Sequence, residues 1–123
     1  MELTVFTTAL GRLSADDLHA LATALSQPGS AADEVDAWHA TLTIDRALRR
    51  AHRARVAAHA ATNASHAVLT VAAHLEIALP DDDVTHVARA AAEIARGLVA
   101  GPDAADEVQS LLRPWVSVLG VAA

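Results

Sequence analysis

Apolar residues recur every three or four positions along most of the chain, which is the spacing of one face of an α-helix. The pattern is clearest from Val84 to Leu98, with Val87, Ala91 and Ile94 between them. Alanine, the strongest helix former, supplies 31 of the 123 residues, and residues typical of β-strands are sparse. The pattern therefore predicts an all-α fold. The expected outward residues of the helix around Val84–Leu98 are Asp82, His86, Arg89, Glu93 and Arg96.

Proline and glycine mark the ends of the predicted helices. A short helix ends at Gly11, and Ser14 with Asp17 forms the capping-box pattern that opens the next helix, to about Ser26. The other expected boundaries are a start at Ser30, an end at Pro80, a start at Asp81, an end at Gly101, a start at Pro102, and a kink or split at Pro114. The prediction is a single domain over residues 1–123, a helical bundle of four main helices plus a short N-terminal helix.

The segment from Ala31 to Leu79 contains no glycine and no proline. One continuous helix of this length would measure about 73 Å, more than the width of a domain of this size. We therefore expect a break between Arg50 and Arg55, where clustered Arg and His residues also suit a helix C-terminus.

Twenty consecutive residues, from Val56 to Leu75, carry no formal charge. This length could span a bilayer, but three histidines, an asparagine and many alanines disfavour insertion. Helical projection separates an apolar stripe of Ala60, Ala64, Val68, Val71, Leu75 and Leu79 from an opposite polar face. The candidate interface on that polar face consists of His59, Asn63, His66, Thr70 and His74.

Two arrangements explain a helix without charge on any side. Either it lies at the centre of the bundle, surrounded by the other helices, or its polar face meets its own copy across a two-fold axis. In the second arrangement the buried imidazoles must be neutral, so we expect a homodimer that weakens below about pH 6.

Five of the nine arginines lie between Arg46 and Arg55, and the chain has no lysine. On a continuous helix Arg46, Arg49, Arg50 and Arg53 form a basic stripe suited to phosphate or acidic groups. The apolar residues Val35, Trp38 and Leu42 project onto the same face, which predicts that this face passes from core to solvent near Arg46. Because the chain carries a net charge of −6, nucleic acid is disfavoured as a partner.

Seven histidines raise the question of a metal site. Three Asp-x-x-His pairs resemble the Glu-x-x-His pairs of di-iron bundles, but each aspartate falls in the first turns of its helix, where the helix dipole explains it. The pairs are Asp16 with His19, Asp36 with His39, and Asp83 with His86. With no cysteine and no glycine-rich phosphate loop, and with every glycine expected in a cap or turn, we expect no metal, no cofactor and no catalysis.

Composition also indicates a setting and a role. Abundant Ala and Arg without Lys follow from GC-rich codons, which favours a bacterial protein, and Glu2 stands where a secretory signal would be basic, which favours the cytoplasm. Trp38 and Trp115 lie on apolar stripes and are expected to be core or interface anchors. The predicted function is association without catalysis, as a homodimer or accessory module. The alternative is a regulator that binds nucleic acid or an acidic partner through the basic stripe.

Overall fold

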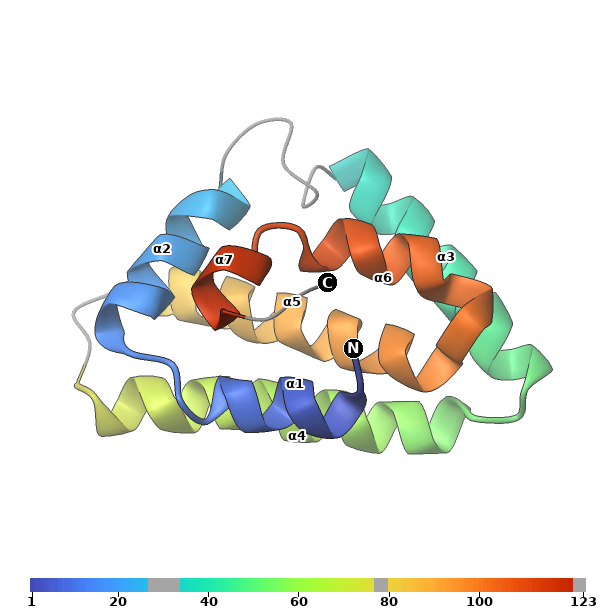
Figure 1. Cartoon of the computed structure of the whole chain (residues 1–123), viewed down its shortest axis with the longest axis horizontal. Coiled ribbons are helices and arrows are strands. Elements are labelled where there is room, and N and C mark those ends of the chain that lie inside the picture. The colour runs from blue at the N-terminus through green and yellow to red at the C-terminus, as the bar shows by residue number, and fades with distance from the viewer. Residues whose placement is uncertain (27–33, 77–79, 121–123) are drawn as a thin grey trace.

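The computed structural model describes residues 1–26, 34–76 and 80–120, and every regular element within them is a helix. The prediction of an all-α helical protein is confirmed. The expected helix start at Ser30 lies outside the described residues. The elements are α1 (Leu3–Leu10), α2 (Ala15–Ser26), α3 (Glu34–Arg50), α4 (Ala54–His74), α5 (Asp81–Ala100), the 3₁₀-helix η1 (Gly101–Ala104), α6 (Ala105–Leu112) and α7 (Val116–Leu119) (Figure 1).

Local chemistry sets the helix ends much as the sequence indicates. At the start of α2 the backbone N–H of Asp17 donates to Ser14 Oγ at 3.1 Å, and the N–H of Ser14 donates to the Asp17 carboxylate at 2.9 Å. This is the reciprocal capping box that the spacing predicts. The helix is interrupted between α3 and α4, where His52 adopts a left-handed backbone conformation with a φ of 57°. Pro114 falls between α6 and α7, so the C-terminal helix is split.

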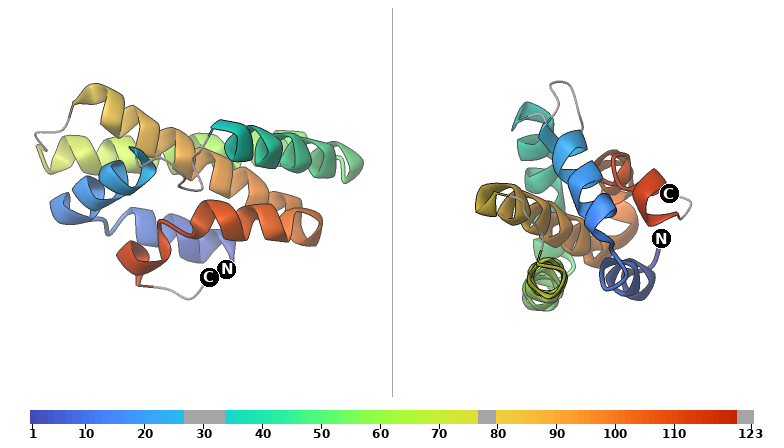
Figure 2. Two further views of the ribbon diagram at one scale, coloured as in Figure 1. Left: turned by 90° about the horizontal axis from the view of Figure 1, so that it is seen from above. Right: turned by 90° about the vertical axis from the view of Figure 1, so that its left-hand side faces the viewer.

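The central helix of the bundle is α5. It packs against α1, α2, α3, α4, α6 and η1, most extensively against α4. Helices α4 and α5 run antiparallel, and α1, α2, α3 and α6 pack against other sides of α5 (Figures 1 and 2). The arrangement that puts the uncharged helix at the centre is therefore wrong. The reason is that α5 buries residues around much of its circumference, whereas α4 buries a single stripe.

Small side chains line the contact between α4 and α5. The buried positions of α4 are Ala57, Ala60, Ala64, Val68 and Ala72. Alanine also occupies buried positions 88, 91 and 95 of α5. Because the alanine side chain is only a methyl group, two helix faces rich in alanine allow the backbones to approach closely. The helices then gain dispersion contacts along their length.

Gly97 lies inside α5 and not in a cap or turn, so the prediction that all glycines occupy caps or turns is wrong. A Cβ atom at this position would overlap the Val108 methyl group Cγ2 from α6 and would lie 3.2 Å from Ile44 Cδ1 of α3. The glycine is therefore where α3, α5 and α6 come closest together. Sequence patterns favour alanine at such a position, and only the packing explains the glycine.

Trp115 is a core residue, as expected: its side chain is fully buried, and its ring meets Phe6 of α1 edge to face with centroids 5.9 Å apart. Within the described residues its indole N–H has no hydrogen-bond partner. Trp38, by contrast, is 66% exposed and is not part of the core.

Replacing Gly97 by alanine should lower the free energy of unfolding by about 1–3 kcal/mol, because the added methyl group overpacks the contact with Val108. In an open helix the same change would be stabilising. The matched control is Gly11→Ala, at a right-handed helical residue whose added Cβ would meet only a carbonyl oxygen, that of Thr8, at 3.5 Å. The control should be neutral or stabilising by about 0.4–1 kcal/mol. Urea denaturation measures both variants, and an unchanged or more stable Gly97→Ala protein would contradict the close approach.

Candidate functional site

All five residues of the predicted interface lie on one exposed face of α4. His59, Asn63, His66, Thr70 and His74 are each solvent-exposed in the isolated chain. Their spacing of three and four residues keeps them together, opposite the stripe that packs on α5. Viewed along its axis, α4 lies at the outer edge of the bundle, with one side facing away from every other element (Figure 2).

Exposed apolar side chains also gather on this helix. Val56 is 60% exposed and Leu69 is 43% exposed, and Leu75, the C-cap residue of α4, is 40% exposed. The expectation that Leu75 continues the core-facing stripe is wrong, because α4 ends at His74. We call the following exposed residues the α4 outer face: Val56, His59, Thr62, Asn63, His66, Leu69, Thr70, Ala73 and His74.

The α4 outer face carries no formal charge along its length, but it is bounded by two opposite charges. Arg55 is exposed in the first turn of α4, and Glu76 is exposed just beyond its last turn. The helix between them is about 31 Å long at 1.5 Å per residue. The face therefore presents a long neutral surface with a positive N-terminal end and a negative C-terminal end.

The predicted basic stripe is divided by the end of α3. Arg46, Arg49 and Arg50 are exposed on its last turns, whereas Arg53 comes after the helix break and its Nη1 donates to the Val99 carbonyl oxygen at 3.4 Å. Arg53 therefore helps to join the start of α4 to the end of α5.

Helix α3 buries a different face from the one that the sequence pattern indicates. Among the α3 residues whose side chains are described, the buried ones are Ala40, Ile44, Ala47 and Leu48. Trp38, Leu42 and Arg49 fall within about 40° of one another around the helix, on the opposite side. The expectation that the Trp38 stripe begins in the core is wrong, and Trp38 instead lies exposed on the same face as the arginines.

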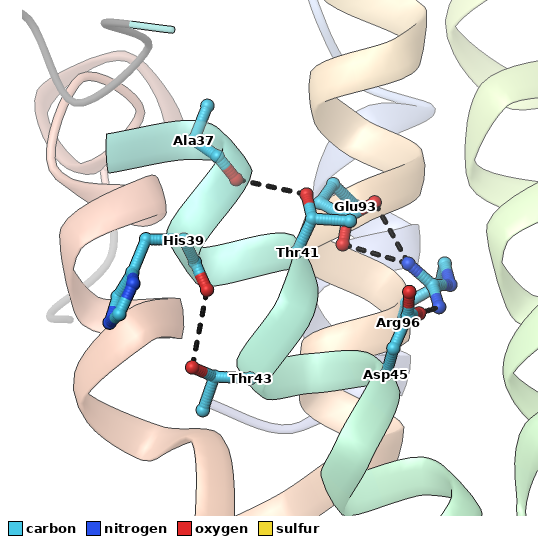
Figure 3. A network of polar contacts seen from close by, with 7 residues as sticks. All are labelled: Ala37, His39, Thr41, Thr43, Asp45, Glu93 and Arg96. Atoms are coloured by element: carbon cyan, nitrogen blue, oxygen red, sulfur yellow. Dashed lines mark hydrogen bonds and ion pairs between the residues drawn. The ribbon is translucent and has the colours of Figure 1, made fainter. Parts of the chain in front are cut away.

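A polar cluster that the sequence analysis missed joins α3 to α5. The Arg96 guanidinium makes an ion pair with Asp45 through Nη2, and its Nη1 donates to both Glu93 carboxylate oxygens, at 2.8 and 3.1 Å (Figure 3). The three side chains are half-buried, with exposures between 23% and 34%. The helical pattern places Glu93 and Arg96 on the outward face of α5, which is incorrect because α3 packs over that part of the helix. A signal was available in the opposite charges of Asp45 and Arg96, but no sequence spacing links residues on two helices.

Burial controls the electrostatics of this cluster. It raises the pKa of Glu93 above the ordinary value of 4.5, and the neighbouring Thr41 side chain partly offsets the effect. Burial also lowers the pKa of Arg96. Desolvation disfavours the charged form of each group, so each needs its partner to stay ionised.

Of the three Asp-x-x-His pairs, the one that contains Asp36 lies partly outside the residues whose side chains are described. Among the described residues, no three His, Asp or Glu side chains are placed so that they could hold a metal ion. None of the helices in the described ranges is long and apolar enough to cross a membrane.

Comparison with known proteins gives no relative: no family model, no curated protein and no solved structure matches this chain. The function must therefore be argued from the chain's own surfaces.

Replacing Glu93 by glutamine should change how stability depends on pH. Because the pKa of Glu93 is raised on folding, the folded protein binds more protons than the unfolded chain just above pH 4.5, so stability contributed by this group increases as the pH falls. The measured quantity is the free energy of unfolding of the original protein minus that of Glu93→Gln, each obtained by urea denaturation. This difference should therefore rise as the pH is lowered from 7 to 5. A difference that stays constant or falls over this range would contradict the raised pKa.

Proposed function

We propose that the protein acts by association, as a homodimer formed through the α4 outer face. The observation that carries the proposal is a helix face about 31 Å long that is exposed and uncharged in a chain of net charge −6. Acidic chains repel one another at long range, so a copy can approach most easily where no charge lies. In this proposal the dimer works in a bacterial cytoplasm, the setting that the composition favours, and performs no catalytic step.

The charges at the two ends of the face favour an antiparallel pair. A two-fold axis perpendicular to α4 and midway between Arg55 and Glu76 passes near His66, which helical spacing also puts at the centre of the exposed face. Arg55 of each copy then lies near Glu76 of the other. A parallel pair would instead put like charges together at both ends.

The small side chains of the face suit a close contact between polar helices. Ala73, Thr62 and Asn63 leave room for the larger His59 and His66 side chains of a second copy to insert. Imidazole, amide and hydroxyl groups can satisfy one another by hydrogen bonds when water is removed, provided that the imidazoles are neutral.

The size of the face sets the expected strength of the dimer. A surface about 31 Å long and about 10–12 Å wide covers roughly 350 Å² on each copy, less than half of the roughly 800 Å² per partner of a standard stable interface. The dimer is therefore expected to be weak and concentration-dependent.

Charge reversal tests the antiparallel arrangement. Arg55→Glu and Glu76→Arg should each weaken the dimer at least about fivefold, because each removes two symmetry-related exposed ion pairs that contribute about 0.5 kcal/mol apiece. The double variant should recover the original dissociation constant. Sedimentation equilibrium over a wide concentration range measures the three variants. The matched control is Arg113→Glu, at an exposed residue just after α6, which should leave association unchanged. A double variant no better than the single ones would exclude this geometry, and a monomer at all concentrations would exclude the proposal.

Acidification provides a second readout of the same dimer. A protonated imidazole carries a positive charge, so acidification puts like charges together across the axis at His59, His66 and His74 of the two copies. At a fixed protein concentration, association should be stronger at pH 8 than at pH 5 and should weaken below about pH 6, with His66→Gln less sensitive to pH than the original protein. An unchanged mass by light scattering from pH 8 to pH 5 would remove the histidines from the interface.

A second candidate function is binding of a single-stranded nucleic acid on the outer face of α3. The observation that favours it is the exposed Trp38 on the same helix face as Arg46 and Arg49, since aromatic rings stack on bases and guanidinium groups bind phosphates. The net charge of −6 opposes it.

Gel-shift titration distinguishes this candidate from dimerisation alone. If it is correct, a single-stranded oligonucleotide should bind at low salt, and Trp38→Ala or Arg46→Ala with Arg49→Ala should each weaken binding about tenfold, in line with stacking and phosphate contacts. Arg113→Ala is the control. No retardation at about 50 mM salt, where phosphate contacts are strongest, would reject nucleic acid as the partner.

A further inference from the structure

A cleft of about 360 Å³ lies between α5 and the helices that cover it on the side away from α4. Its apolar lining includes Leu25 of α2, Ile94 of α5, Leu111 of α6 and Pro114. The volume falls at the small end of the range of about 300–1,000 Å³ that is typical of small-molecule sites. None of its lining residues belongs to α4, so it is independent of the proposed dimer surface.

One wall of the cleft is polar and contains both signs of charge. Glu93 and Thr41 face each other there across α3 and α5 (Figure 3). Arg89, one helical turn before Glu93, lies at the exposed rim together with His86. In the described residues Arg89 makes no ion pair, whereas Glu93 shares Arg96 with Asp45.

The distribution of charge around the cleft favours two different groups on one ligand. Arg96 is a single cation between two half-buried carboxylates, so this cluster has one net negative charge that an ammonium group would balance. Among the described residues Arg89 has no ion-pair partner, and it lies about 6 Å along the helix from Glu93, the spacing of residues four apart. A carboxylate can bind its guanidinium through two parallel hydrogen bonds.

We propose that the cleft binds a small apolar α-amino acid. The ammonium group binds the Glu93 carboxylate, the carboxylate group binds Arg89 at the rim, and the aliphatic side chain occupies the space lined by Leu25, Ile94 and Leu111. A molecule with only one of the two charges leaves the other protein group without a partner. A larger polar side chain would be desolvated against the apolar lining without compensation.

The test compares the binding of leucine with that of its two halves, 3-methylbutylamine and 4-methylpentanoate, at pH 7.5. Two-dimensional NMR of the full chain should show leucine-dependent shifts at residues 86–94 and 111–114, with a dissociation constant of about 1 mM or below. Leucine should bind at least about tenfold more tightly than either half, because each charged group contributes its own charge-assisted hydrogen bonds.

Two conservative variants separate the roles of the charges. Glu93→Gln should reduce leucine affinity about tenfold and leave 4-methylpentanoate unaffected or better bound, whereas Arg89→Gln should reduce leucine affinity about tenfold and leave the amine unaffected. The controls are Glu107→Gln and Arg46→Gln, neither of which lines the cleft. Circular dichroism first shows whether each variant is folded. If one of the two cleft variants fails to fold, the other still tests the proposal.

The proposal is overturned if leucine binds no more tightly than its two halves, or if both cleft variants bind leucine as tightly as the original protein does. It is also overturned if no chemical shifts change at a leucine concentration about 20 times the expected dissociation constant. Because the α4 residues are not involved, dimer variants such as Arg55→Glu should leave the leucine affinity unchanged.

Discussion

The close approach of helices to α5 is the constraint on which the rest of the structure depends. Alanine residues on both sides of the contact between α4 and α5, and Gly97 where α3 and α6 meet α5, remove the side-chain volume that would hold the backbones apart. The contact between α4 and α5 is therefore rich in alanine, and it depends on many short-range dispersion contacts that a single added methyl group can disrupt. Larger side chains such as Trp115 and Phe6 are fully buried and pack against each other elsewhere in the core.

This packing decides which surfaces remain available. Since α4 contacts α5 through one narrow stripe, its other side is left exposed, and that side contains no charged residue between Arg55 and Glu76. A helix that is apolar on one side and polar but uncharged on the other needs no partner protein in order to fold. Its uncharged side also causes little electrostatic repulsion of an approaching partner. The modest area of the face explains why association through it is expected to respond to concentration and pH.

The cluster of Asp45, Arg96 and Glu93 links the packing to the cleft. By joining α3 to α5 it fixes how the two helices are placed relative to each other, at a cost in desolvation that its ion pairs offset. The same packing leaves the Glu93 carboxylate at the wall of a small apolar space. The dimer surface and the cleft thus lie on opposite sides of α5, and each can be tested without disturbing the other.

The sequence alone determined the helical class, most helix ends and the polar face of α4, because capping, proline and three-to-four-residue spacing act within a few residues of the chain. The break before Ala54, the capping box at Ser14 and the grouping of His59 and His66 on one polar face all follow from such local rules. The tertiary structure alone decided that α5 is central, that Trp38 faces outward and that Asp45 meets Arg96, because each depends on which helix lies against which. Periodicity describes one helix at a time, so it predicts that a face will be buried without indicating what will cover it.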